Sequence, residues 1–148
     1  MKSELNFPNI LVGAGGHAKV IFYTLEKIDI EISFVVDPKV KNFLNIFNTI
    51  NSLESLPIGI DEPINFFIAV GDIDLRKKIY HNINMTFKNA IFPAIISPDC
   101  VLYPECSIKE GVVILAGSVI GPNSRIDKFS IINHSVTVDH DSSIGEFC

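Results

Sequence analysis

Two histidines near the end of the chain, His134 and His140, are suited to proton transfer at neutral pH. Asp139 and Asp141 flank only the second histidine. A carboxylate that accepts a hydrogen bond from one ring nitrogen fixes the tautomer, so the other nitrogen can accept a proton. This pattern favours His140 over His134 as a general base. The alternatives are an exposed polar corner, which suits His134 best, and a metal site gathered around an oligomer axis.

A second group of residues with chemical potential is the turn GAGGHA at 13–18, which fits the pattern G-x-G-x-x-A between a strand and a helix. Such glycines let backbone N–H groups approach a phosphate at the helix N-terminus. Asp37 ends the next predicted strand, where a carboxylate can bind ribose hydroxyls. The alternative is a turn that only packs the helix on the strand. Only one half of a dinucleotide fold fits here, which favours a mononucleotide or sugar nucleotide over NAD.

The elements that position this turn alternate along residues 1–93. Apolar runs at 9–15, 32–37, 65–72 and 89–96 predict strands, the last one interrupted by Pro93. Helices are predicted at 16–27 and 73–83, the second with Leu75, Ile79 and Ile83 on one stripe. Strands that alternate with helices predict a parallel α/β sheet, here a half-Rossmann βαβαβ domain.

The elements that position the histidines are six-residue repeats over 94–148. The first position of each hexad is aliphatic: Ile96, Leu102, Ile108, Ile114, Ile120, Ile126, Ile132, Val138 and Ile144. The fifth position is small: Cys100, Cys106, Val112, Ser118, Ser124, Ser130, Val136, Ser142 and Cys148.

This period predicts a triangular solenoid in which three hexads make one coil. The aliphatic residues point inward and stack on their equivalents one coil away, and each contributes roughly 1.5–3 kcal/mol when buried. Both histidines fall at position three, near a corner and pointing outward. All three cysteines fall at the small fifth position, so they are predicted to be structural and not metal ligands.

Composition excludes several classes of function. The net charge is −5 and the densest basic cluster is the RKK at 76–78, which argues against nucleic acid or an anionic membrane as a partner. No apolar run approaches the roughly 20 residues that span a bilayer. The N-terminus lacks the pattern of a signal peptide, so a cytoplasmic protein is expected.

Taken together, the sequence resembles the NeuD/PglD-type sugar acyltransferases. The matching stretches are GAGGHAKV at 13–20, FVVD at 34–37, AVGDIDLRKKIY at 69–80, the hexads, and VDHDSSIGEF at 138–147. They cover nearly the whole chain and are specific for the family, though not for its substrate. The resemblance implies a left-handed parallel β-helix, a homotrimer, and acetyl-CoA bound along the β-helix between neighbouring subunits.

The resemblance also implies roles for individual residues, with no metal in the reaction. His140 would deprotonate the acceptor amine or hydroxyl, Asp141 would orient it, and Asn133 would lie beside the thioester. The nucleotide-sugar pocket would be lined by Gly13, Gly15, Gly16, His17 and Asp37, with Gly71 at the tip of the third strand. The expected reaction is N-acetylation of a UDP-4-amino-sugar or O-acetylation of the sialic acid type.

Family members continue beyond the motif GEF with a second histidine and further coils that hold the coenzyme. This chain stops at Cys148, within the repeat pattern. The resemblance therefore predicts a C-terminally incomplete β-helix of about three coils, with a partial donor site and weak turnover. Two other classes of function remain open. One is a non-catalytic sugar-nucleotide-binding or assembly module. The other is an NAD-dependent oxidoreductase, which would leave the hexads without a role.

Overall fold

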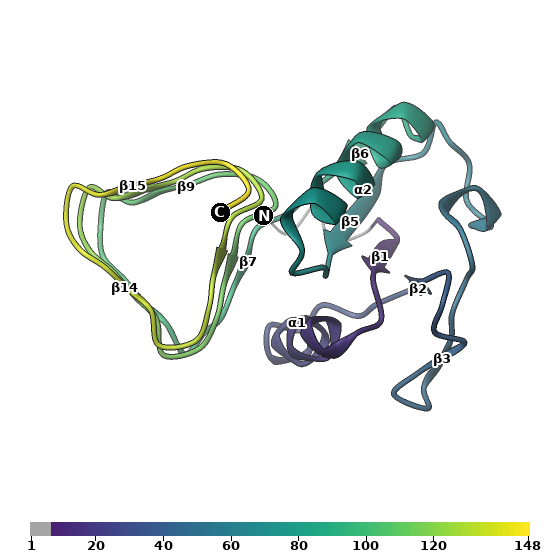
Figure 1. The fold of residues 1–148 in the computed structure, drawn as a ribbon, viewed down its shortest axis with the longest axis horizontal. Helices are drawn as coiled ribbons and strands as arrows, with labels where there is room; N and C mark the ends of the chain where they lie inside the picture. The colour runs from purple at the N-terminus through teal and green to yellow at the C-terminus, as the bar shows by residue number, and fades with distance from the viewer. Residues whose placement is uncertain (1–6) are drawn as a thin grey trace. The chain divides into compact units, whose positions relative to one another are not determined.

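The computed structural model describes residues 7–148 and divides the chain into two compact units that meet between Phe92 and Pro93. The N-terminal unit is an α/β domain and the C-terminal unit is a stack of coils (Figure 1).

The N-terminal unit is built on a parallel four-stranded sheet in the order β2-β1-β5-β6. Its elements are β1 (Asn9–Val12), α1 (Gly16–Lys27), β2 (Phe34–Val36), β3 (Asn42–Phe43), β4 (Phe47–Asn48), η2 (Leu53–Ser55), β5 (Ile64–Ile68), α2 (Ile73–Thr86) and β6 (Ala90–Ile91). Strands β1 and β5 are buried along their whole length, as expected for a sheet covered on both faces. Strand β2 pairs with one edge of β1, and the next strand of the sheet, β5, pairs with the other edge. The strand order therefore reverses beside β1.

Three features of the chain differ from the sequence prediction. The single strand predicted at 89–96 is two short strands in different units, Ala90–Ile91 and Ile95–Ile96, with Pro93 between them. Strands β3 and β4 form a short antiparallel hairpin, which was not predicted because this stretch lacks a strong alternation of apolar and polar residues. The apolar stripe of α2 is also divided: Ile83 is fully buried, whereas Leu75 is 47% exposed. The reason is that the two ends of α2 have different surroundings. Its first turns border a cavity, which Leu75 and Ile79 line, while Ile83 packs in the core.

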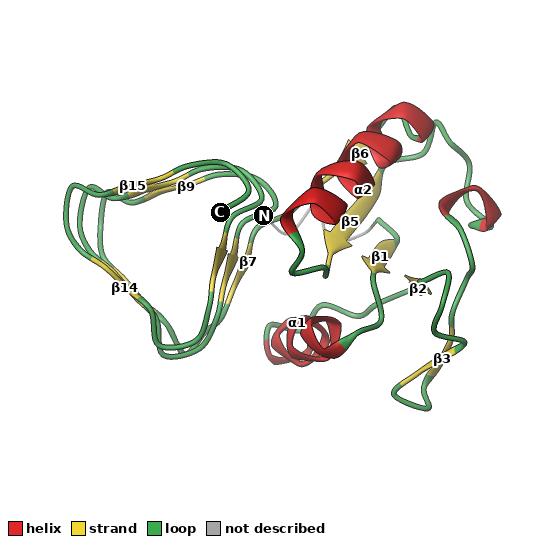
Figure 2. Cartoon of the chain, viewed as in Figure 1, coloured by secondary structure: helices red, strands yellow, loops and turns green. Residues whose placement is uncertain are grey.

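The C-terminal unit is a left-handed parallel β-helix, seen end-on as a triangle in Figure 1 and with its short strands in yellow in Figure 2. Three three-stranded sheets form its sides, in the orders β13-β10-β7, β14-β11-β8 and β15-β12-β9. The strands are β7 (Ile95–Ile96), β8 (Val101–Leu102), β9 (Ser107–Ile108), β10 (Val113–Ile114), β11 (Val119–Ile120), β12 (Arg125–Ile126), β13 (Ile131–Ile132), β14 (Thr137–Val138) and β15 (Ser143–Ile144).

The strand register confirms the predicted stacking of the hexads. Ile114 pairs with Ile96 on one neighbouring strand and with Ile132 on the other, which is one coil of 18 residues in each direction. The aliphatic residues of the middle hexads, such as Ile120 and Ile126, are fully buried. The first position of the repeat therefore forms the hydrophobic core of this unit, except at Leu102 in the first coil, which is 42% exposed.

The fifth position of the hexads has a role beyond being small. The hydroxyl groups of Ser118, Ser124 and Ser130 are buried and donate to the carbonyl oxygens of Asn133, Asp139 and Gly145, each 15 residues ahead. The Cys106 thiol donates in the same way to the Gly121 carbonyl oxygen, over 3.1 Å. These side chains tie each coil to the next, and Cys106 takes part as a structural residue. Cys148, at the last fifth position, is exposed.

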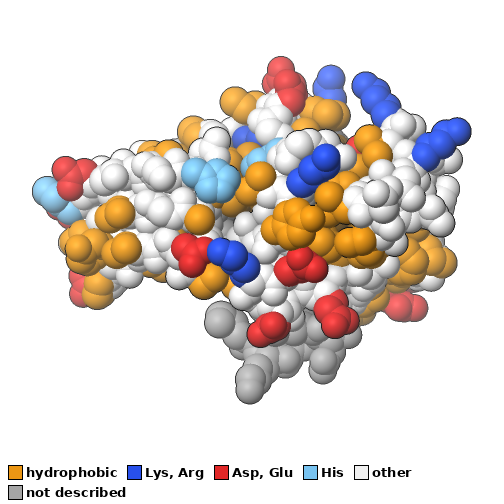
Figure 3. Space-filling view, turned by 90° about the horizontal axis from the view of Figure 1, so that it is seen from below, with side chains coloured by type: hydrophobic (Ala, Val, Ile, Leu, Met, Phe, Trp, Pro, Cys, Tyr) orange, Lys and Arg blue, Asp and Glu red, His pale blue; other side chains and the backbone are white. Residues whose placement is uncertain are grey.

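The surface carries charges of both signs. On the face drawn in Figure 3, Lys and Arg side chains are scattered among acidic and hydrophobic ones. Among the helices in the described part of the chain, none has the length and apolar character needed to cross a bilayer.

Candidate active site

A left-handed backbone conformation recurs at position four of every hexad from the second one onward, and so at all three corners of the coil. The residues with positive φ there are Glu105, Gly111, Gly117, Asn123, Phe129, Ser135, Asp141 and Phe147. Asn, Asp and Gly adopt this conformation with the least strain. Asp141 has a φ of 56°, and its side chain contacts that of the preceding residue, His140.

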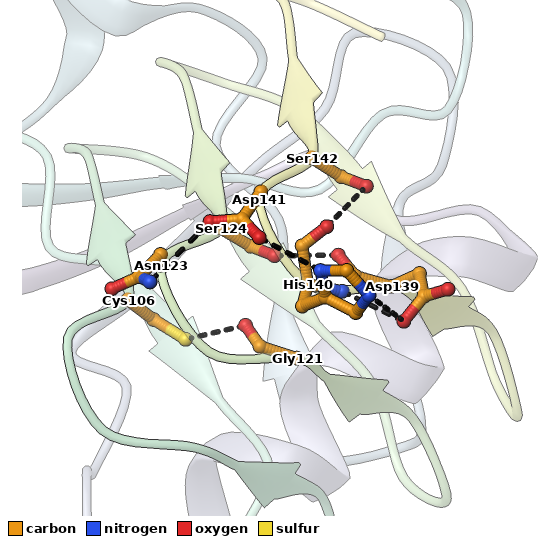
Figure 4. A network of polar contacts seen from close by, with 8 residues as sticks. All are labelled: Cys106, Gly121, Asn123, Ser124, Asp139, His140, Asp141 and Ser142. Carbon is orange, nitrogen blue, oxygen red and sulfur yellow. Dashed lines mark hydrogen bonds and ion pairs between the residues drawn. The ribbon is translucent and has the colours of Figure 1, made fainter.

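The His140 ring meets Asp141 at this corner (Figure 4). The distance from Nδ1 of His140 to Oδ2 of Asp141 is 2.7 Å. Because an ionised carboxylate only accepts hydrogen bonds, Nδ1 carries the proton and donates it. Nε2 is then the basic nitrogen. It lies 3.9 Å from Oδ1 of Asp139, beyond hydrogen-bond range, and the side chain is 68% exposed.

The charges around His140 favour its protonated form. The hydrogen bond that the His140 ring donates to Asp141 raises the pKa of His140 above its usual 6.5, and the negative charges of Asp139 and Asp141 act in the same direction. The same hydrogen bond lowers the pKa of Asp141, helped by the Asn123 amide. His140 is therefore a stronger base than an isolated histidine, and Asp141 stays ionised across the neutral range.

His134 occupies the equivalent place one hexad earlier but has different neighbours. Its Nδ1 lies 3.2 Å from the amide oxygen of Asn133, and position four of its hexad is Ser135. In both hexads the residue at position two accepts a hydrogen bond from the histidine backbone N–H. Only His140 has a carboxylate partner for its ring, so the two histidines differ in the ring partner and not in the backbone hydrogen bond.

The structure does not bring Asn133 next to His140 within one chain. Asn133 follows β13 and His140 follows β14, so they lie at different corners of the triangle. The Asn133 side chain is exposed and accepts from the His134 backbone N–H over 2.9 Å.

The glycine turn after β1 contains glycines of two kinds. Gly13 has a φ of 111°, and a Cβ there would lie 2.9 Å from the Ala69 carbonyl oxygen, so the fold itself requires this glycine. A Cβ at Gly15, Gly16 or Gly71 would meet no protein atom within 4 Å. The last three glycines therefore border open space.

Helix α1 begins at Gly16, next to this open space. Gly15 is its N-cap and has no side chain to satisfy the first N–H groups, and the first turn contains no acidic residue. These groups carry the positive end of the helix dipole. His17, the second residue of the helix, is half-buried.

Asp37 holds the turn together through three backbone N–H groups. Its Oδ2 accepts from Ala14 over 2.9 Å, and its Oδ1 accepts from Lys39 and Val40 over 2.8 and 2.9 Å. A carboxylate offers about four acceptor positions. Asp37 thus shapes the loop first and retains little capacity for ribose hydroxyls, which the sequence alone did not reveal.

A cavity of about 320 Å³ opens at the carboxyl ends of β1, β2 and β5. Of the predicted binding residues, Gly13 and Asp37 line it, together with Val12, Val36, Pro38, Lys39, Asn51, Ser52, Leu53, Glu54, Val70, Leu75, Ile79 and Asn82. Gly15, Gly16, His17 and Gly71 are not part of this lining. Open α/β sheets bind ligands at this end of their strands, where the strand order reverses.

A larger cavity, of about 440 Å³, lies elsewhere in the same unit, between α1, the loop before β2 and the β3–β4 hairpin. Its acidic residues are Glu26, Asp29 and Glu31. It lies at the amino end of β2, so the smaller cavity has the better position for a nucleotide.

One residue of the N-terminal site was missed by the sequence analysis. Arg76 on α2 is only 2% exposed, and its Nη1 donates to the carbonyl oxygens of Val70 and Gly71 over 3.0 and 2.8 Å. The guanidinium thus fixes the loop after β5. In the sequence it looked like part of a solvated basic helix face.

Comparisons with known proteins agree with this architecture. The family model described as the PglD N-terminal domain matches residues 10–83. PerB from Caulobacter crescentus, solved in complex with CoA and GDP-perosamine, is 29% identical with a TM-score of 0.84, over 97% of this chain and 68% of its own. The acetyltransferase domain of PglB from Neisseria gonorrhoeae is 27% identical with a TM-score of 0.82, over 96% of this chain and 69% of its own.

Two further structures add chemical context. The same PglB domain was solved in complex with acetyl coenzyme A. The Caulobacter enzyme, named a GDP-perosamine N-acetyl transferase, was also solved with a histidine replaced by alanine. WeeI from Acinetobacter baumannii, at 16% identity and a TM-score of 0.65, shares the fold.

Proposed function

The chain belongs to the NeuD/PglD-type family of sugar acetyltransferases, and from that premise we propose that it moves an acetyl group from acetyl-CoA to the amino group of a nucleotide-activated sugar. The hydrogen-bonded pair of His140 and Asp141 carries this proposal, because it supplies a base of the right tautomer at an exposed corner. The complexes of the relatives with CoA, acetyl coenzyme A and GDP-perosamine support the choice of both substrates.

The proposed reaction is a direct attack on the thioester. The acceptor nitrogen bonds to the acetyl carbonyl carbon and loses a proton to Nε2 of His140. The carbon–sulfur bond then breaks, and the proton held by His140 passes to the departing thiolate. Asp141 keeps Nδ1 protonated throughout and stabilises the imidazolium that forms. Atoms and charges balance without a further reactant.

The N-terminal unit is the proposed binding site for the nucleotide part of the acceptor. In this proposal the nucleotide occupies the cavity at the carboxyl ends of β1, β2 and β5, which Gly13 lines. The backbone N–H groups of Gly15 and Gly16, at the start of α1, bind the diphosphate. Gly71 and His17 are proposed to lie beside the bound diphosphate. Asp37 contributes mainly by holding the glycine turn in place.

A homotrimer is the proposed assembly. Asn133 and His140 occupy different corners of one β-helix. Asn133 can therefore lie beside a His140 only when the two residues come from neighbouring copies of the chain. Acetyl-CoA would bind between these copies. O-acetylation of a sialic acid-type sugar is a second proposal, since a hydroxyl can use the same base. The cytoplasmic location stays a prediction.

Replacing Gly16 by alanine should separate nucleotide binding from folding. A Cβ there meets no protein atom, and alanine in a helix is favoured over glycine by roughly 0.5–1 kcal/mol, so the melting temperature should stay equal or rise. The methyl group nevertheless occupies the proposed path of the diphosphate. Isothermal calorimetry with UDP-linked and GDP-linked sugars should show affinity reduced about tenfold or more, which is about 1.4 kcal/mol. Unchanged affinity would move the diphosphate away from α1.

The pH dependence of the reaction should follow His140. Neutral imidazole is the active form, and its pKa is raised, so kcat/KM should increase with pH through a value above 6.5. Replacing Asp141 by asparagine removes the main cause of the shift while keeping a residue that tolerates positive φ. The acid limb should then move to lower pH. An acid limb at the same pH in both proteins would mean that another group titrates.

A non-catalytic sugar-nucleotide-binding module remains the alternative function. It predicts the same calorimetric result without any release of free CoA. A thiol assay run on the chain with acetyl-CoA and the tightest-binding nucleotide amino-sugar separates the two, because only the acetyltransferase releases a thiol in proportion to acceptor.

A further inference from the structure

The hexad at 120–125, one coil before the one that carries His140, differs from the others in what it presents to the coil above. Gly121 lies beneath the peptide that joins Asp139 to His140 (Figure 4). A Cβ at Gly121 would lie 2.6 Å from the His140 backbone nitrogen and 2.9 Å from the Asp139 carbonyl carbon. Real Cβ atoms do not approach backbone that closely, so any side chain here displaces the segment of the base.

This close approach is particular to Gly121 and not to its place in the repeat. Gly121 is at position two of its hexad, and its φ is not in the left-handed region, so the turn does not demand glycine. Among the hexads of the described residues that have a coil stacked above, position two otherwise carries a side chain: Ser97, Tyr103, Lys109, Leu115 and Asp127. The stacked coils therefore accommodate a Cβ at those positions, whereas at Gly121 they do not.

A second residue of the same hexad contacts the partner of the base. Asn123 lies one coil before Asp141, and its Nδ2 donates to Oδ1 of Asp141 over 3.3 Å. The other oxygen of that carboxylate accepts from the His140 ring over 2.7 Å. The carboxylate is thus held on both sides, which limits its rotation. Both Asn123 and Asp141 have positive φ, so the two corners are stacked in the same conformation.

A third contact, from the Ser124 hydroxyl to the Asp139 carbonyl oxygen, belongs to the general serine ladder of the helix. Ser118 and Ser130 make the same bond in other hexads, so Ser124 is not specific to the site. The contacts peculiar to this hexad are those of Gly121 and Asn123.

We propose that the hexad 120–125 is a platform that positions the general base, with Gly121 admitting the His140 backbone and Asn123 orienting Asp141. Both are positioning residues, because neither needs to touch the substrates. The catalytic meaning of the platform rests on the proposed acetyl transfer, whereas the geometry it imposes on the His140 ring can be measured without any reaction.

The geometric test is nuclear magnetic resonance of the histidine ring nitrogens in the ¹⁵N-labelled chain. The platform predicts that His140 is held as the Nδ1–H tautomer in the parent protein. Gly121→Ala and Asn123→Gly should each increase its Nε2–H fraction and move its titration to lower pH, because the ring loses its carboxylate partner. His134 is an internal reference in the same spectra, since it has no carboxylate at position four.

Matched controls separate positioning from general effects of the substitutions. Gly145→Ala places the same methyl group at the same hexad position, where the nearest atom, Sγ of Cys148, is 3.8 Å away. Ser135→Gly also introduces glycine at position four of a hexad, at an exposed residue with positive φ. Both controls should leave the His140 signals unchanged. If Gly121→Ala does not fold, Asn123→Gly still tests the proposal, because glycine readily adopts the left-handed conformation at that corner.

The kinetic test should show lower kcat with little change in the KM for the nucleotide sugar. We expect a loss of about 100-fold for Gly121→Ala, the size of effect that a displacement near 1 Å can cause. For Asn123→Gly we expect roughly a tenfold loss, a part of the about 10²–10⁴-fold that a positioned base contributes. Identical His140 spectra in the parent protein and both variants would overturn the platform. Altered spectra in a chain that transfers no acetyl group would support the platform and refute the proposed function.

Discussion

Replacing His140 by alanine should lower kcat about 10²- to 10⁴-fold, the usual contribution of a positioned general base. The affinity for the nucleotide sugar should stay nearly unchanged, because the proposed nucleotide site lies in the N-terminal unit. The ring is 68% exposed, so its removal should also leave the fold intact. Steady-state kinetics with calorimetry on the same preparation checks both statements.

His134→Ala is the matched control for this substitution. The two histidines occupy the same hexad position and make the same backbone hydrogen bond to the residue before them. They differ in the ring partner, which is a carboxylate for His140 and an amide oxygen for His134. A small effect at His134 beside a large one at His140 therefore assigns the loss to the base. Full activity of His140→Ala would make His134 the next residue to test.

Replacing Ile126 by aspartate should unfold the β-helix. Ile126 is fully buried in the middle of its stack, between Ile108 and Ile144. An unpaired carboxylate there loses the packing of the isoleucine and must be desolvated, and together these effects exceed about 4 kcal/mol. Urea denaturation followed by circular dichroism should show loss of the β-helix transition or insoluble protein.

Arg125→Ala is the control in the same strand. The Arg125 side chain is 57% exposed and pairs with Asp127 over 2.8 Å, an interaction worth about 0–1 kcal/mol at a surface. Its stability should therefore stay within about 1 kcal/mol of the parent protein. A stable Ile126→Asp variant with an unchanged transition would show that the first position of the hexads does not face the core.

The β-helix could be predicted from the sequence because each six-residue repeat corresponds to one side of a coil, with its first residue in the core. Each aliphatic first position, such as Ile114, contacts its equivalent one coil away, so period and fold are nearly the same information. The glycine turn and the start of α1 at Gly16 were predicted for a similar reason, since both depend on local backbone conformation.

Other features depend on contacts that no local pattern contains. The burial of Arg76 follows from where α2 meets the loop after β5, and the role of Asp37 follows from the path of the loop over it. The left-handed corner at position four could have been found in the sequence, because Gly, Asn and Asp recur there with spacings that are multiples of six, as at Gly117, Asn123 and Asp141. Residues such as Phe129 at the same position obscured that signal.

Mass spectrometry of the acceptor after incubation with acetyl-CoA is the measurement that tests the central claim most directly. The chain should be offered UDP-linked and GDP-linked amino-sugars, their hydroxyl analogues and sialic acid, with the parent protein and His140→Ala in parallel. The account predicts one added acetyl group on the nitrogen of a nucleotide-linked amino-sugar, formed by the parent protein and nearly absent with His140→Ala. Nucleotide-sugar binding with no acetylated product from any acceptor would contradict it.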